Sequence, residues 1–269
     1  MPRPHIFIAT HHKSGTVWML ATFRRIAKAN GMAYVRLNEG ENGWDLRSDR
    51  DSYFETKRSA VEKASDSPGI FFNFHSDIPD LTRCKDECGA RGIHVVRDPR
   101  DLLISGARFH LVADEAWLHE PMPEYGGMTY QQKLLSYETM EDRIKFEMDH
   151  HMGQVIRDMD GFDDQGVFQR VQYEDLIVDR DMVLFHQLLV HLGMQGRALI
   201  HGLDAFWKSS LFGERSEHDL KATRNHIFDS RLKQWADVLT PSTLELIESR
   251  FEREILGLGY ALSSSACLG

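Results

Sequence analysis

The sequence predicts an α/β fold in which a mostly parallel central sheet is covered by helices on both faces. Short apolar runs typical of buried strands recur along the chain, and helical patterns lie between or after several of them. The first apolar run leads through a Lys-Ser-Gly-Thr turn directly into a helical pattern. The strands are expected at residues 6–9, 33–37, 69–74, 92–96 and 167–171.

Helical periodicity is clearest in three segments. The first helix is expected at 16–30, with Gly31 as its stop signal. The second is expected at 179–192, after the fifth strand. The third is expected at 241–256, with Thr240 as its N-cap.

Two regions interrupt the alternation of strands and helices. Residues 38–67 are polar and predict a loop with a surface helix, whereas residues 108–164 are interpreted as an insertion that covers the site and contains a helical run at 131–159. Aromatic and Met side chains of the insertion either line a substrate pocket or pack a small subcore. They are Trp117, His119, Met122, Tyr125, Met128, Tyr130 and Tyr137. Without a visible repeat or linker, residues 1–269 are expected to form one domain.

Composition excludes several classes of function. A formal net charge of -9 argues against a general nucleic-acid binder. No apolar run is long enough to span a bilayer and no secretion signal is apparent, so we expect a cytoplasmic protein without a membrane anchor.

Three cysteines, Cys84, Cys88 and Cys267, form no paired framework and favour a reduced compartment. The spacing of Cys84 and Cys88 fits two ordinary thiols, with a redox or metal role as the alternative.

The turn after the first strand is the first candidate site. Backbone N–H groups at a helix start bind phosphate or sulfate, and Gly15 lets the backbone close on such an anion. Ser14 and Thr16 would add hydroxyl donors, and Lys13 would supply a mobile positive charge. The turn lacks the glycine spacing of a Walker A loop. The alternative is a plain helix start capped by Ser14.

A second constellation follows the strand at 92–96. Arg97 is expected at the end of this strand, and Ser105 lies one helical turn after Asp101, so Arg97 and Ser105 can flank one phosphate. Asp98 and Asp101 are expected to act as helix-start charges and as partners of an arginine. Arg100 is expected at the surface.

Together, the two constellations resemble the sulfotransferases that use 3′-phosphoadenosine 5′-phosphosulfate (PAPS). In that family a Lys-Ser-Gly-Thr-x-x-Trp loop holds the 5′-phosphosulfate, and an Arg-x-x-x-Asp-x-x-x-Ser pattern holds the 3′-phosphate. This chain has a shortened first pattern in Lys13, Ser14, Gly15, Thr16, Val17 and Trp18, and the second in Arg97, Asp101 and Ser105. The resemblance implies a P-loop NTPase-like fold, PAPS as donor, 3′-phosphoadenosine 5′-phosphate (PAP) as product, and no metal.

The resemblance also implies roles for single residues. His75, at the end of the strand expected at 69–74 between the two patterns, would be the general base, and Lys13 would stabilise the leaving phosphate. Ser105 would restrain Lys13 or bind the 3′-phosphate. Tyr173, in a Tyr-Glu-Asp segment after a later strand, would lie near the adenine.

The chain also departs from the family pattern. His12 stands where many relatives have proline, and Asn73-Phe74 where many have Lys-Thr before the base. The late Arg-Lys-Gly loop that grips the 3′-phosphate is not visible. Its local substitutes are Lys221, Arg224 and Arg231, of which we favour Arg224.

The predicted function is transfer of a sulfuryl group from PAPS to a hydroxyl or amine of an acceptor, with a small molecule favoured. One alternative is a P-loop-type kinase or phosphotransferase, in which Asp98 would position Mg²⁺. Another is a nucleotide-binding module without turnover.

Overall fold

The computed structural model describes residues 5–37, 69–73, 81, 84–86, 89–213 and 231–263. The chain divides into two compact units. The first, the sheet unit, comprises residues 1–96 and 161–219, and the second, the helical unit, comprises residues 97–160 and 220–269. Organisation as one domain stays a prediction. The polar segment 38–67, Cys88 and Cys267 lie outside the described residues.

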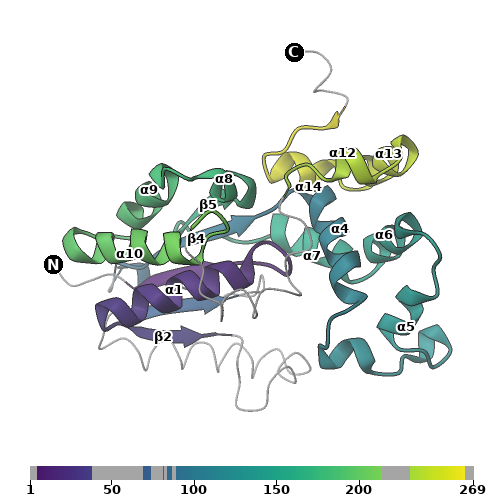
Figure 1. The fold of residues 1–269 in the computed structure, drawn as a ribbon, viewed down its shortest axis with the longest axis horizontal. Coiled ribbons are helices and arrows are strands. Elements are labelled where there is room, and N and C mark those ends of the chain that lie inside the picture. Colours follow the sequence, from purple (N-terminus) through teal and green to yellow (C-terminus); the bar gives the residue numbers. More distant parts are fainter. Residues whose placement is uncertain are drawn as a thin grey trace. The chain divides into compact units, whose positions relative to one another are not determined.

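The sheet unit contains a five-stranded sheet in the order β2-β3-β1-β4-β5, and all neighbouring strands are parallel (Figure 1). This confirms the predicted fold class. β1 lies between β3 and β4, so the loop that leaves its carboxyl end emerges near the middle of the sheet. The strands are β1 (Ile6–Ala9), β2 (Ala33–Arg36), β3 (Gly69–Asn73), β4 (Arg91–Val96) and β5 (Phe168–Gln172).

Both faces of the sheet are buried, as expected for parallel strands. Along β1, Ile6 and Ile8 belong to one apolar cluster, whereas Phe7 and Ala9 belong to another. The first cluster includes side chains from the helices of this unit. These helices are α1 (Thr16–Asn30), α8 (Tyr173–Val178), α9 (Val183–His191) and α10 (Gly196–Ser209).

α1 has the predicted bounds, and Gly31 ends it in the left-handed conformation that glycine tolerates best. α9 begins at Val183 rather than at residue 179 as predicted, with Met182 (φ 55°) as its N-cap. Residues 173–178, which precede the predicted helix, form the separate helix α8.

α10 was not predicted from the sequence, although it packs along α1 (Figure 1). Its Phe206 is completely buried. The Phe206 ring stacks on Trp18 of α1 at 5.2 Å and on Phe185 of α9 at 3.9 Å between ring centroids. α10 therefore connects the first helix to the later part of the sheet unit.

The helical unit differs from the predicted pattern in how its helices are divided. The run expected at 131–159 is three helices, because Thr129 and Thr139 cap new starts and the backbone at His150 is non-helical. The helix expected at 241–256 divides at Phe251, while Thr240 is its N-cap as predicted. The helices are α4 (Pro99–His110), η2 (Ala116–His119), η3 (Pro123–Tyr125), α5 (Tyr130–Leu135), α6 (Met140–Asp149), α7 (His151–Asp160), α12 (Trp235–Val238), α13 (Pro241–Arg250) and α14 (Glu252–Gly257).

The aromatic side chains of the expected insertion pack a small subcore, one of the two alternatives for them. Tyr130 belongs to its buried centre, and Trp117, Met122, Tyr125 and Tyr137 pack against it. A polar group is buried beside this cluster: Glu147 accepts a hydrogen bond from the Tyr130 hydroxyl at 2.9 Å and contacts His110 Nδ1 at 2.6 Å.

None of the helices in the described part of the chain combines the length and the apolar character needed to cross a bilayer.

Replacing Phe206 with alanine should destabilise the sheet unit strongly. The change empties a site between Trp18 and Phe185, and a cavity of this kind costs about 3–5 kcal/mol. The matched control on the same helix is Ile200→Ala, because Ile200 is 65% exposed and its truncation should change the free energy of unfolding by less than about 0.5 kcal/mol. Urea denaturation measures both, and equal losses would contradict the packing role of Phe206.

Candidate functional site

The β1–α1 loop, residues 10–15, has an unusual backbone. Lys13 has φ 65° and Gly15 has φ 99°, both in the left-handed region. Gly15 is the N-cap of α1, and no side chain caps this helix. A Cβ at Gly15 would lie 2.9 Å from Cδ2 of Tyr173, so both the backbone angle and the close approach require glycine.

The backbone of His11 closes this loop. Its N–H donates to Ser14 Oγ at 2.8 Å. Its carbonyl accepts hydrogen bonds from Ser14 N and Ser14 Oγ, both at 3.0 Å, and from Thr16 Oγ1 at 2.8 Å. The Ser14 and Thr16 hydroxyls therefore bond within the loop, and Ser14 is not the helix cap considered above.

The start of α1 is suited to an anion. The first N–H groups of an α-helix have no partner within the helix, and here they belong to Thr16, Val17 and Trp18. The helix dipole adds partial positive charge at the same end. The loop can therefore hold an anion through its backbone, with Lys13 as the nearby charged side chain.

A buried pair of histidines joins the loop to β4. Nε2 of His11 and Nε2 of His94 are 2.8 Å apart, and both side chains are almost inaccessible to solvent. Burial lowers the pKa of His11 to about 3. Burial also lowers the pKa of His94 well below its ordinary value, with smaller contributions from the charges of His11 and Arg170. Both rings are therefore neutral near pH 7, one donating its Nε2 hydrogen to the other.

Tyr173 lies against the loop. It directly follows β5, its ring approaches Gly15, and it meets the Trp18 ring edge-on at 6.1 Å between centroids. The structure thus brings together the predicted loop residues, Trp18 and Tyr173 within the sheet unit.

Arg97 and Ser105 belong to the helical unit. Arg97 precedes α4 and is buried, and Ser105 lies half-buried on α4, one turn after Asp101. Burial raises the pKa of Asp101 to about 6, while the charge of Arg97 and a hydrogen bond from Trp235 N act in the opposite direction. That hydrogen bond measures 3.0 Å to Asp101 Oδ1, consistent with the structural role expected for Asp101.

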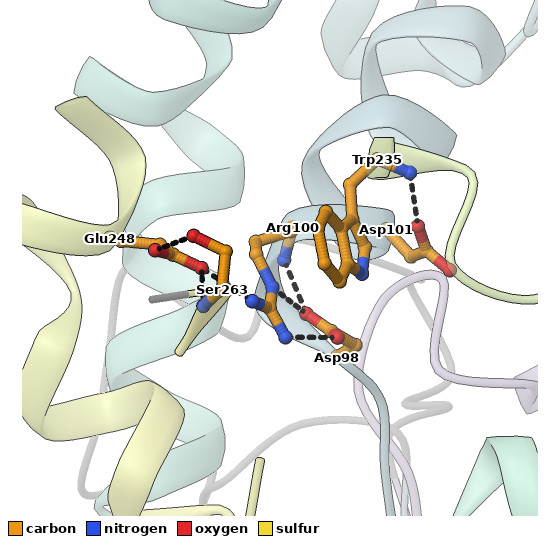
Figure 2. A network of polar contacts seen from close by, with 6 residues as sticks. All are labelled: Asp98, Arg100, Asp101, Trp235, Glu248 and Ser263. Carbon is orange, nitrogen blue, oxygen red and sulfur yellow. Dashed lines mark hydrogen bonds and ion pairs between the residues drawn. The ribbon is translucent and has the colours of Figure 1, made fainter. Parts of the chain in front are cut away.

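Arg100 is buried, so the expectation that it lies at the surface is wrong (Figure 2). Its Nε and Nη2 donate to the two oxygens of Asp98 at 2.9 and 2.8 Å, and its Nη1 donates to Glu248 at 2.5 Å. The guanidinium lies 4.1 Å from the centre of the Trp235 ring. Burial disfavours the charge of Arg100, but the hydrogen bonds and charges of Asp98 and Glu248 outweigh it and raise its pKa.

This network joins segments far apart in the chain. Asp98 is also the N-cap of α4, accepting a hydrogen bond from Arg100 N at 3.0 Å. Glu248 of α13 accepts hydrogen bonds from Ser263 N and Oγ at 2.8 and 2.7 Å. The start of α4 is thereby tied to α13 and to the segment after α14 (Figure 2).

Three predicted site residues, His75, Lys221 and Arg224, lie outside the described residues. Arg231, another candidate for the late basic position, forms an exposed ion pair with Asp237 at 3.0 Å.

The two buried histidines, His11 and His94, were not predicted as part of the site from the sequence. The signal that was present is a polar residue, His94, within an apolar strand.

Removing the Arg100 charge should cost far more stability than removing an exposed one. Arg100→Met leaves Asp98 and Glu248 without their buried partner, which costs about 3–5 kcal/mol. The matched control, Arg250→Met, breaks an ion pair with Asp149 in which both side chains are largely exposed, and should cost less than about 1 kcal/mol. Urea denaturation compares the two, and similar losses would refute the buried role of Arg100.

Acid should destabilise the protein partly through His11. In the unfolded chain its pKa is near 6.5, whereas in the folded protein it is about 3. The unfolded state therefore binds more protons between these values, and the free energy of unfolding falls as the pH falls from 6.5 towards 3. In His11→Gln this fall should be shallower, as measured by urea denaturation from about pH 7 to pH 4. An unchanged pH dependence would contradict a neutral, buried His11.

The chain is similar to known sulfotransferases in sequence and in fold. The family model described as "Sulfotransferase domain" matches residues 3–184, more than half of the 269-residue chain. No curated protein matches in a search of sequences. Among solved structures, mouse sulfotransferase SULT7A1 complexed with PAP matches with a TM-score of 0.60 at 14% identity, over 100% of this chain and 90% of that chain.

Two further structures match with lower scores. The sulfotransferase domain from the curacin biosynthetic pathway matches with a TM-score of 0.40 at 14% identity, covering 97% of this chain and 99% of that chain. The sulfotransferase domain from the Synechococcus PCC 7002 olefin synthase matches with a TM-score of 0.39 at 13% identity, covering 93% and 94%. The mouse enzyme shares the fold, and the match of the family model over residues 3–184 shows that this chain belongs to the sulfotransferase family.

Proposed function

We propose that this protein transfers a sulfuryl group from PAPS to a hydroxyl or amine of a small-molecule acceptor and releases PAP. The observation that carries the proposal is the β1–α1 loop, whose uncapped helix start and left-handed Lys13 and Gly15 suit an anion such as a phosphosulfate. The mouse sulfotransferase with this fold was solved with PAP, which supports the same donor here.

The donor would be held at its two charged ends. The N–H groups of Thr16, Val17 and Trp18 would bind the 5′-phosphosulfate, with the charge of Lys13 beside them. Arg97 and Ser105 would bind the 3′-phosphate, with Arg224 as the favoured late basic residue and Lys221 or Arg231 as its substitutes. The aromatic rings of Tyr173 and Trp18, next to the loop, suit the adenine.

The reaction would use one base and one cation. His75 would take the proton of the acceptor hydroxyl or amine as the acceptor atom bonds to sulfur. The bond between sulfur and the phosphate oxygen breaks, and Lys13 would stabilise the negative charge that develops on the leaving phosphate. These steps balance in charge and atoms without a metal.

The geometry disfavours the kinase alternative. In that hypothesis Asp98 would position Mg²⁺, but both of its carboxylate oxygens accept hydrogen bonds from Arg100. A nucleotide-binding module without turnover differs from the proposed enzyme only in lacking the base. A single domain over residues 1–269, a covering role for residues 108–164 and a cytoplasmic location remain part of the proposal.

The test of this function separates donor binding from transfer. His75→Ala should bind PAP within about 2-fold of the wild type in calorimetry, because a base contributes little to donor affinity. Transfer from labelled PAPS to a panel of phenols, alcohols and amines should fall by about 10²–10⁴-fold. His186→Ala, an exposed histidine on α9, is the control and should leave both measurements unchanged.

Unchanged transfer in His75→Ala would refute the assignment of the base. Activity that requires ATP and is lost with EDTA would refute sulfuryl transfer and favour the kinase. Tight binding of PAP by the wild type, without transfer to any acceptor, would favour the binding module.

A further inference from the structure

We propose that His94 is a positioning residue for the donor: through its hydrogen bond to the ring of His11, it holds the β1–α1 loop in the conformation that binds the phosphosulfate. The proposal rests on the proposed function, because it takes this loop as the donor site. It adds a residue outside the loop that determines donor affinity.

The loop depends on where His11 lies. The backbone N–H and carbonyl of His11 bond to Ser14 and Thr16, on the far side of Lys13. These contacts hold Lys13 in a left-handed conformation that a residue with a side chain adopts at a cost. If the His11 backbone shifts, the positions of Lys13 and of the helix start shift with it.

The ring of His11 is held in turn by His94. The 2.8 Å contact between their Nε2 atoms joins the loop to a strand, because His94 lies within β4. His94 pairs in register with Ala9, the last residue of β1 before the loop. Its ring also stacks on Phe162 at 4.1 Å with an interplanar angle of 28°. His94 is therefore a rigid anchor, fixed by the sheet and by an aromatic neighbour.

Packing alone does not require two histidines here. Buried polar groups cost free energy unless they are hydrogen-bonded, and an apolar pair would fill the same space without that cost. What the histidine pair adds is direction, because a short bond between two Nε2 atoms fixes the orientation of both rings. The position of the His11 backbone follows from the orientation of its ring.

Substitutions at His94 separate the hydrogen bond from the packing. Glutamine places an amide near the position of Nε2 and can bond to His11, whereas methionine has a similar size and cannot donate or accept a strong hydrogen bond. We expect His94→Met to raise the Kd for PAP and the KM for PAPS about 10-fold, with kcat at saturating PAPS changed less than about 3-fold. His94→Gln should restore both values to within about 2-fold of the wild type.

His191→Met provides the matched control. His191 Nε2 bonds to the carbonyl of Gly92, on the same strand β4, at 3.2 Å, but within the described part of the chain His191 makes no hydrogen bond to the loop. This variant should lower the melting temperature and leave the Kd for PAP unchanged. A loss of affinity confined to His94→Met would then reflect the loop rather than general destabilisation.

Three outcomes would overturn the proposal. Folded His94→Met that binds PAP as the wild type does would show that the loop does not depend on the pair. His94→Gln as weak as His94→Met would assign the effect to the ring itself. If His94→Met does not fold, His11→Gln and His11→Met make the same comparison with the same expected order. A wild-type protein that binds no PAP would overturn the proposed function, and this proposal with it.

Discussion

The hydrogen bonds to the backbone of His11 are the constraint on which the candidate site depends. They turn the chain from the central strand β1 into α1 within a few residues, and they force left-handed angles on Lys13 and Gly15. Because both hydroxyls of the Lys-Ser-Gly-Thr turn bond within the loop, the anion of the proposed donor would be held by the N–H groups of the helix start. The Ser14 and Thr16 hydroxyls, which the sequence presents as candidate ligands, therefore stabilise the backbone of the loop.

In the helical unit, buried charged side chains fix the start of α4. Arg97 precedes α4 and Ser105 lies on this helix, whose start is held by Arg100 between Asp98 and Glu248. A buried ion pair contributes little net stability compared with an apolar replacement, but it is costly to break. Because Glu248 lies on α13, the position of the segment that contains Arg97, Asp101 and Ser105 depends on a helix that begins about 140 residues later in the chain.

Local signals predicted most of the fold, and long-range contacts explain what was missed. Apolar runs located all five strands within one or two residues, and Gly31 and Thr240 marked a helix end and a helix start. α10 and Phe206 were missed because their role depends on Trp18 and Phe185, which are distant in sequence. Arg100 looked like a surface residue for the same reason, since nothing near it in the sequence indicates Glu248 or Trp235.

The neutral state of the pair His11 and His94 means that the side chains that hold the loop differ from the side chain that carries its charge. A charged imidazolium buried at this position would need a partner of opposite charge. If both rings were protonated, neither Nε2 atom could accept, and the hydrogen bond between them would be lost. Burial keeps His11 and His94 neutral, so the supports of the loop carry no charge. In the proposed reaction, Lys13 would then supply the full positive charge of the Lys-Ser-Gly-Thr turn, beside the partial positive charge of the helix start.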